Sequence, residues 1–529
     1  MIQENPEAGF VNIDDFSGGM NTQDSPIALE NNQAQIMLNA VLTKKGGISV
    51  RNGYGKYSSS AFPTSAGAWT YRSTWEIIRY YTPSFSITVA AVRYYDATRL
   101  FWYDEDAGSV TYGTWVELTT TAPIAATNRV SFCIYRDILF VFNGLDVLKY
   151  WDGNTTTSAL TDCGFKAGTL TVYPKLMKVC DDRLFMVGYA DGVYSRTSVF
   201  YTNFDAWSGA VPTELEFENN NEIVLKDRIS DKRGITALYT SALNDELLVT
   251  VEFGTYELIG TDEDNYEFKK ISNEAGCVSQ NGMTTTPYET IIMVGVNEVY
   301  EITDSGFNPI ATQIKKKLQE RVLTECCVEY DKDTDSVIIA AGPTGDGELV
   351  YNARTGGWTE WSIGIDTIHR FKYSGDDERL IFVKTSTNNV YTFDSAYDDD
   401  DGTAFNFKLK TKAFQVDGFA PTKTIRTIKA IYDSTHDNAT ELPFDLTISI
   451  NNGDTIVSIR DTVKGTRWNN FKWNQAAWAA GTLMIGSSSV QLNPGNIVVF
   501  TIEKTNDNKL TLYGLAVNAK LLSGRFEEG

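Results

Sequence analysis

Histidine is nearly absent from this chain, because only His369 and His436 occur among its 529 residues. The cysteines contain no C-x-x-C pair, and neither histidine lies near a group of them; they are Cys133, Cys163, Cys180, Cys277, Cys326 and Cys327. Zinc sites are built from closely spaced Cys and His ligands. We therefore expect no metal and no cofactor, and we interpret the cysteines as buried free thiols. The adjacent Cys326 and Cys327 should face opposite ways if they lie in a strand.

Long apolar runs are also missing. No stretch reaches the roughly 18 apolar residues that a membrane-spanning helix requires. The first residues, Met1-Ile-Gln-Glu-Asn-Pro-Glu7, lack the basic and apolar regions of a signal peptide. We therefore expect no membrane-spanning segment and a protein that is made and folded in a cytoplasm.

Basic side chains are scarce relative to acidic ones, with 46 Lys and Arg against 68 Asp and Glu and a formal net charge of −22. This balance argues against a surface that grips nucleic acid through its phosphates. It is compatible with a surface that nucleic acid passes without sticking, and equally with simple solubility.

The sequence lacks the common catalytic motifs. It contains neither G-x-S-x-G beside a histidine nor the phosphate-binding G-x-x-x-x-G-K-[ST] loop. A sialidase-like Ser-x-Asp-x-Gly-x-Thr-Trp repeat is not found, and Ala353-Arg-Thr-Gly-Gly-Trp-Thr-Glu-Trp361 only approaches it. We expect no catalytic residue, and we expect Trp358 to have a packing role.

Two acidic segments could hold a cation. Asp331, Asp333 and Asp335 match the start of a calcium loop, but Ser336 and Gly342 stand where such a loop needs Gly and Glu. The flanking apolar runs favour a hairpin turn there. The run Asp398–Asp401 is interpreted as a solvated acidic loop, with a cation at a propeller rim as the alternative.

What the chain does have is a strand-rich unit that recurs from about Trp69 to Phe414. Each copy contains an apolar run, a turn and a second run, as in Asp137-Ile-Leu-Phe-Val-Phe-Asn-Gly-Leu-Asp-Val-Leu-Lys-Tyr-Trp-Asp-Gly153. A small sheet cannot bury both faces alone, so repetition implies sheets stacked on their neighbours. We predict an all-β fold, a β-propeller of about six to seven blades with an extended N-terminal arm and a C-terminal β-sandwich.

The predicted domains are the N-terminal arm and cap at 1–60, the β-propeller at 61–404 and the β-sandwich at 405–529. Within the arm, Pro26–Ala40 has apolar residues at helical spacing and predicts a helix. Val50–Tyr54 is expected to lead into the first blade. Ile314–Arg321 predicts a short helical insert between two blades.

Two stretches carry a resemblance. The first begins Phe16-Ser-Gly-Gly-Met-Asn-Thr-Gln-Asp-Ser-Pro26 and ends with Gly46-Gly47 and Arg51-Asn-Gly-Tyr54. The second includes Gly254-Thr-Tyr-Glu-Leu258 and Glu274-Ala-Gly-Cys-Val-Ser279. In this order they resemble the β-propeller nozzle or hub proteins of short-tailed bacteriophages.

The resemblance implies a structural virion protein of the tail, not an enzyme. Members form a ring, commonly a hexamer, around the channel through which double-stranded genomic DNA leaves the capsid. It also implies contacts with adaptor or portal-proximal proteins above and with tail fibre or spike proteins below. Acidic side chains on the ring's lumen would repel phosphates, so we expect them to outnumber basic ones there.

Candidate interface residues follow from this picture. They are the arm residues Phe16, Met20, Leu29 and Tyr54 and the lysines Lys315, Lys316 and Lys317. For the lysines, a solvated helix face is the alternative. For the whole protein, the alternative is a carbohydrate-binding or glycosidase-like β-propeller, since propellers also host such sites.

Overall fold

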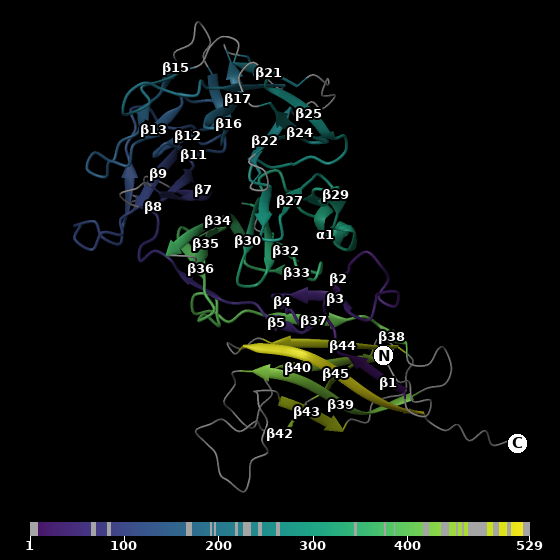
Figure 1. Cartoon of the computed structure of the whole chain (residues 1–529). Coiled ribbons are helices and arrows are strands. Elements are labelled where there is room, and N and C mark those ends of the chain that lie inside the picture. The colour runs from purple at the N-terminus through teal and green to yellow at the C-terminus, as the bar shows by residue number, and fades with distance from the viewer. Residues whose placement is uncertain are drawn as a thin grey trace, which may run out of the picture.

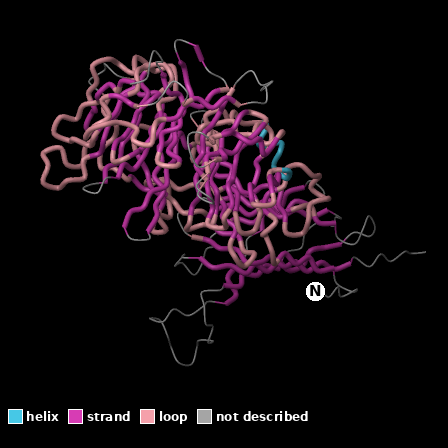
Figure 2. The backbone as a smooth tube through the Cα atoms, turned by 45° about the horizontal axis from the view of Figure 1, so that its top comes forward, coloured by secondary structure: helices cyan, strands magenta, loops and turns pink. Residues whose placement is uncertain are grey.

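The computed structural model describes residues 9–521. The gaps within this range are 65–69, 82–85, 166–171, 191–192, 195–196, 217–220, 226–233, 242–245, 261–264, 343–345, 375–376, 386, 416–422, 435–443, 451–452, 458–459, 464–483, 490–496 and 505–508. Strands dominate the described residues, and the helices among them are η1 (Thr312–Ile314) and α1 (Lys315–Gln319). Figure 2 shows α1 as the cyan element in a chain of magenta strands.

The larger part of the molecule is a propeller of seven blades, each built on four antiparallel strands (Figure 1). The first four blades are β7 (Tyr71–Tyr81), β8 (Ser86–Tyr94), β9 (Thr98–Tyr103), β10 (Trp115–Leu118); β11 (Ser131–Tyr135), β12 (Ile138–Phe142), β13 (Lys149–Trp151), β14 (Thr161–Asp162); β16 (Val172–Cys180), β17 (Arg183–Ala190), β19 (Ser198–Tyr201), β21 (Glu222–Val224); and β22 (Ile235–Thr240), β23 (Leu247–Val251), β24 (Gly254–Ile259), β25 (Glu267–Ser272).

The last three blades are β26 (Met283–Thr286), β27 (Thr290–Val294), β28 (Val299–Thr303), β29 (Gly306–Pro309); β30 (Cys327–Asp331), β31 (Ser336–Ala340), β32 (Glu348–Asn352), β33 (Trp358–Trp361); and β34 (Ile365–Ser374), β35 (Asp377–Lys384), β36 (Val390–Phe393), β6 (Tyr54–Lys56). Short accessory strands are β15 (Gly164–Phe165), β18 (Val193–Tyr194) and β20 (Glu214–Leu215). The predicted propeller of about six to seven blades is confirmed.

The apolar runs of the repeat become strands that are buried on both faces. In β12, Leu139 and Val141 pack between blades one and two, whereas Phe140 and its alternate neighbours pack between blades two and three. Side chains alternate across a strand, so one continuous apolar run supplies two cores. The stacking of neighbouring blades follows directly from this pattern.

The ring is closed by a strand from far away in the sequence. β6 pairs antiparallel with β36, Tyr54 opposite Phe393, and so completes blade seven. The prediction that Val50–Tyr54 leads into the first blade is therefore wrong, because this segment joins the last one. Blades seven and one also meet at Asp366, whose carboxylate accepts hydrogen bonds from Thr74 N at 3.2 Å and Thr385 Oγ1 at 2.9 Å.

The second part of the molecule is a two-sheet sandwich below the propeller in Figure 1. One sheet has the order β4-β5-β45-β39-β43-β42, with β1 beside β45. These strands are β1 (Gly9–Ile13), β4 (Ala40–Leu42), β5 (Ile48–Val50), β39 (Lys423–Ser434), β42 (Arg460–Val463), β43 (Met484–Ser489) and β45 (Leu510–Leu521). Residues from both ends of the chain therefore build this sheet together.

The other sheet is continuous with blade six. Its order runs β30-β31-β32-β33-β3-β37-β44-β40-β41, with β2 beside β3 and β38 beside β44. The added strands are β2 (Gly19–Met20), β3 (Gln33–Leu38), β37 (Phe407–Thr411), β38 (Phe414–Gln415), β40 (Asp445–Ile450), β41 (Gly453–Val457) and β44 (Ile497–Lys504). The join between β3 and β33 is a single parallel pair, Leu38 with Glu360.

The predicted helix at Pro26–Ala40 is wrong. Turns occupy its first part, and its second part is strand β3, where Met37 is fully buried opposite Leu409 of β37. Tertiary pairing with β37 outweighs the local helical spacing. Asn39 has φ of 53° and lies between β3 and β4.

The predicted insert at Ile314–Arg321 is confirmed as α1.

Candidate functional surfaces

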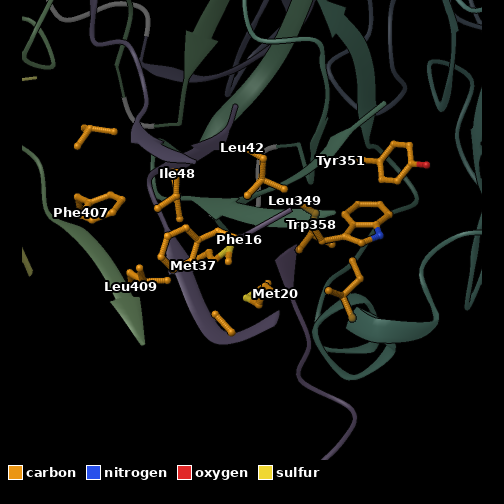
Figure 3. Close-up of a cluster of buried hydrophobic side chains, with 14 of the residues drawn as sticks. Phe16, Met20, Met37, Leu42, Ile48, Leu349, Tyr351, Trp358, Phe407 and Leu409 are labelled. Atoms are coloured by element: carbon orange, nitrogen blue, oxygen red, sulfur yellow. The ribbon is translucent and has the colours of Figure 1, made fainter. Parts of the chain in front are cut away.

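The four arm residues proposed for an interface lie inside this chain. Phe16 and Met20 are 2% and 1% exposed and pack in the core that joins blade six to the sandwich (Figure 3). Leu29 is 2% exposed. Tyr54 is 1% exposed and packs edge-on against Phe382 of blade seven, with ring centroids 5.2 Å apart. In this conformation these side chains connect parts of one chain and present no surface to a neighbour.

One of the three lysines differs from the other two. Lys317 Nζ is 3.0 Å from a carboxylate oxygen of Glu360, which also receives Arg321 at 2.6 Å. Lys315 and Lys316 are exposed, and no ion pair of either is found within the described part of the chain. Two of the three predicted lysines are thus available for a partner.

All six cysteines are buried free thiols in the structure. Cys326 packs in the core shared with the sandwich, and Cys327 packs in the core between blades six and seven. The expected opposite orientation of this pair is confirmed. Burial raises the pKa of Cys133, Cys163 and Cys277 to about 12, so these thiols stay protonated near neutral pH.

The Asp331–Asp335 segment is a hairpin turn, as predicted. Asp331 accepts hydrogen bonds from Asp333 N and, at 2.6 Å, from Thr334 Oγ1. Asp335 accepts from Tyr330 Oη at 2.7 Å and forms an ion pair with Lys44 at 3.3 Å. Partners from the chain itself thus engage both carboxylates. Among the described residues, no group of three or more His, Cys, Asp or Glu side chains could hold a metal ion.

The acidic run Asp398–Asp401 is neither free in solvent nor arranged around a cation. Arg51 is 2% exposed and binds both oxygens of Asp400, at 2.8 and 2.6 Å. Lys56 lies 3.5 Å from Asp401, and Lys509 lies 3.2 Å from Asp398. The interpretation as a solvated loop is corrected for Asp400, which the buried Arg51 holds, whereas Asp398 and Asp401 remain partly exposed beside lysines of the sandwich and the arm.

Charged side chains meet on the axis of the propeller. Arg129, just before blade two, donates to Glu325 O at 3.1 Å and to Cys327 Sγ at 3.2 Å beside blade six. Asn281, just before blade five, donates at 3.3 Å to Glu76 of blade one. Both contacts join blades that are not neighbours. The axis of the single propeller is therefore crossed by side chains, and double-stranded DNA has no path along it.

A second layer of axial groups comes from blades three, six and seven. Burial raises the pKa of Glu329 to about 7, although nearby Arg370 and Lys178 act in the opposite direction. Burial, with Lys178 and Arg370, lowers the pKa of His369 to about 4. Thr284 Oγ1 is 3.5 Å from Glu329, and Arg370 Nε is 3.9 Å away. This layer therefore holds a neutral imidazole and a carboxyl that titrates near neutral pH.

These axial groups do not form a nucleophile relay. No side-chain hydrogen bond of His369 is found in the described residues, so it has neither a hydroxyl to activate nor a carboxylate to orient it. His436 lies outside the described residues. The segment Ala353–Trp361, the approach to a sialidase repeat, is structural: Trp358 is fully buried and its Nε1 donates to Ile310 O at 2.8 Å.

One cavity of about 280 Å³ lies between the β4–β5 hairpin and the turns of blade six. Lys44 and Arg354 line it together with Asp333 and Asp335. Asp335 pairs with both cations, at 3.3 and 3.8 Å. The cavity therefore has no dominant charge with which to select a ligand.

In blades two, three, five and six, described turns join the first and second strands on one side of the propeller, where the connections from third to fourth strands also lie; we call this side the turn face. Tyr80 at the end of β7 donates to Asp137 O in the next blade's turn, and Tyr135 donates to Asp182 O in the one after, both at 2.6 Å. Exposed carboxylates of this face are Glu105, Asp106, Asp137, Asp152, Asp181, Asp182, Asp205, Glu289, Asp304 and Asp333. Exposed basic residues described on or beside this face include Lys44, Arg136, Lys332, Arg354 and Lys372.

Neither the axial residues nor the pairing of Arg51 was predicted from the sequence. Arg129, Glu329 and Arg370 lie within or beside apolar strands. A single charged residue in an apolar strand of a blade could have indicated a position on the propeller axis. Arg51 could not be assigned to Asp400, because 349 residues separate the two and no local pattern connects them.

In the described part of the chain, no helix is long and apolar enough to cross a membrane.

No known protein family matches the sequence, and no curated protein matches it. Solved structures do resemble the fold. A structure of YCF48 bound to D1 peptide has 11% identity and a TM-score of 0.38 over 63% of this chain and 99% of that one.

The extracellular domain of the one-component system BT4673 from B. thetaiotaomicron has 11% identity and a TM-score of 0.44, over 89% of this chain and 62% of that one. A chain of the mitotic checkpoint complex has 10% identity and a TM-score of 0.37, over 64% of this chain and 98% of that one. At such values these proteins say nothing about activity. The chain is a seven-bladed β-propeller joined to a β-sandwich.

Proposed function

We propose that this protein is a structural subunit of a bacteriophage tail, a nozzle or hub ring through which the genome is ejected. The observation that carries the proposal is the joining of propeller and sandwich into one body. Blade six continues through β3 into the sandwich, and β6 from the same N-terminal segment closes blade seven. Shared strands hold the propeller and the sandwich together, which suits a subunit that must keep its shape in an assembly.

Two glycines of the resembling motifs lie at close backbone approaches, one at the join of blade six to the N-terminal segment and one between blades four and five. Gly19 packs with no room for a side chain, since an added Cβ would lie 2.3 Å from Trp358 N of blade six. Gly276 likewise leaves only 1.9 Å between an added Cβ and Val251 O. The motifs therefore encode close backbone approaches within the scaffold, which supports a structural role for them.

Charge supports the same proposal. The net charge is −22, and the turn face carries many exposed carboxylates and fewer exposed cations. Carboxylates repel the phosphates of passing DNA, which prevents binding along the path. Because Arg129 and the Asn281–Glu76 contact cross the axis of the single propeller, the DNA channel in this proposal lies between subunits of a ring.

Electron microscopy of the purified protein tests the proposal. We expect closed rings, commonly sixfold, with an axial hole wide enough for a DNA duplex. A monomer at all concentrations, or a ring with a strongly basic lumen, contradicts it. Incubation with host glycans tests the carbohydrate-acting alternative: cleavage or tight binding supports that class and contradicts ours.

A further inference from the structure

Two exposed surfaces on the rim of the propeller are complementary, because one is apolar and acidic and the other is apolar and basic. The first is a loop. This blade-one loop, Asp104–Thr114, connects β9 to β10. At its tip Val110 is 104% exposed and Tyr112 is 59% exposed. Asp106 beside them is also exposed. The tip of the loop thus presents an apolar and an aromatic side chain to solvent next to a carboxylate.

The loop is held in its shape by its own hydrogen bonds. The Asp104 carboxylate, 2% exposed, accepts from Asp106 N at 3.0 Å and from Thr111 Oγ1 at 2.5 Å. The backbones of Asp104 and Thr114 pair at 3.0 Å, and Ser59 Oγ donates to Gly113 O at 2.8 Å. A pre-ordered loop loses little conformational entropy when a partner binds its tip.

The second feature is at the rim between blades five and six. This helix patch consists of the exposed Lys315 and Lys316 of α1 and the neighbouring Val322, which is 58% exposed. Glu320, the nearest carboxylate in the sequence, forms no ion pair with either lysine. In a chain of net charge −22, two lysines without a counter-ion in the described residues are notable.

The two features lie apart on the rim. In Figure 1, β8 and β9 are at the left edge of the propeller and α1 is at its right edge, and Figure 2 retains this separation. Contacts that close a ring are heterologous: each subunit offers two different surfaces at different places, one to each neighbour. The positions of the loop and the patch meet this requirement.

Resting on the proposed ring function, we propose that the blade-one loop of one subunit docks on the helix patch of the next copy of this chain. Val110 and Tyr112 cover Val322 and the aliphatic stems of the lysines. Asp106 faces the ammonium groups of Lys315 and Lys316. The contact thus joins an apolar centre to a charge pair of opposite sign.

The experiment uses two full-length variants. The loop variant carries Val110→Ser and Tyr112→Ser, and the helix variant carries Lys315→Glu and Lys316→Glu. All four residues are exposed, so both variants should keep the thermal midpoint of the unaltered chain. Phe253→Ser, at a 52% exposed position on blade four, and Lys45→Glu, at an exposed position in the β4–β5 turn, are the matched controls.

Mass in solution is measured by sedimentation and by light scattering. We expect rings for the unaltered chain and both controls, and monomers for each variant alone. An equal mixture of the two variants should give dimers, because each retains the surface that the other lacks.

Rings from either variant overturn this inference while leaving the proposed function intact. A mixture that stays monomeric also overturns it, since the two surfaces then do not meet each other. If the unaltered chain forms no ring, the proposed function itself fails, which is a distinct result.

Discussion

At the scale of single residues, Arg51 connects the N-terminal segment to the Asp398–Asp401 loop, a role that no sequence motif indicates. Besides both oxygens of Asp400, its guanidinium donates to Asn39 Oδ1 at 3.0 Å. Its Cζ atom lies over the ring of Phe405, 3.8 Å from the ring centroid. A planar guanidinium suits such combined stacking and bidentate pairing, which lysine could not reproduce.

We expect Arg51→Met to lower the free energy of unfolding by about 3–5 kcal/mol, because it leaves a largely buried carboxylate without a partner. Denaturant titration followed by tryptophan fluorescence measures the loss. Lys56→Met is the control: its pair with Asp401 is half-exposed, so the loss should be at most about 1 kcal/mol. Equal losses in the two variants would contradict the assignment.

Glu329 gives the axis a defined pH response. Its pKa is raised to about 7 in the folded protein, above the ordinary value of about 4.3. Between these values the folded state holds a proton that the unfolded state has released, so this group's contribution to stability falls as pH rises toward 7.

Glu329→Gln removes that titration. We therefore expect the stability of the variant, relative to the unaltered chain, to increase from pH 5 to pH 7 and then level off. Thermal midpoints at half-unit pH intervals measure it. Glu289→Gln, at an exposed turn, is the matched control. A difference that stays constant with pH would show that Glu329 does not titrate in this range.

At the scale of elements, two glycine motifs are explained by backbone contact. Gly276 lies in the connection between blades four and five, where an added Cβ would meet Val251 O and, at 2.7 Å, Gly254 N. Both neighbours are backbone atoms of the turn between β23 and β24, which cannot rotate away. The motif glycines Gly254 and Gly276 therefore lie in contact with each other through their backbones.

We expect Gly276→Ala to destabilise the protein by about 1–3 kcal/mol or more, as overpacking does in closely packed interiors. Hydrogen exchange should show the loss first in β23 and β24. Gly108→Ala is the control, because its added Cβ meets only the Asp106 side chain, at 3.3 Å. An unchanged thermal midpoint for Gly276→Ala would contradict the packing argument.

The elements that the sequence predicts well are those whose signal is local. α1 matches the helical insert expected at Ile314–Arg321, and β12 matches an apolar run that is buried on both faces. Pro26–Ala40 fails because the helical spacing of its apolar residues is outweighed by pairing with β37. The placement of β6 fails for a related reason: nothing in Tyr54–Lys56 specifies β36 as its partner.

The candidate surfaces follow the same rule. The exposure of Lys315 and Lys316 could be predicted from a short polar helix, whereas the burial of Phe16 and Tyr54 depends on partners more than 300 residues away. Pairing with distant strands determines which apolar residues of the arm remain accessible to solvent. The local sequence does not indicate this pairing.

At the scale of the whole molecule, the N-terminal segment is shared between the two parts of the fold. β1 to β5 pair within or beside the sandwich, and β6 completes the propeller. Removing residues 1–56 should therefore damage both parts at once, with loss of the cooperative unfolding transition measured by calorimetry. A chain that starts at Gly9 is the control, since it retains every described strand. Survival of an intact propeller in the shorter chain would show that β6 is dispensable.

The pairing of β1 with β45 has a consequence for how this protein is made. Phe10 lies opposite Asn518, so β1 is synthesised about 500 residues before the strand with which it pairs. At translation rates of about 5–20 residues per second, that delay is on the order of half a minute or longer. During this time β1 lacks its partner strand on the nascent chain, so the sandwich cannot be completed, whereas the propeller needs no strand beyond β36. Chaperones that shield unpaired strand edges should therefore increase the yield of soluble protein, and co-expression would measure the gain.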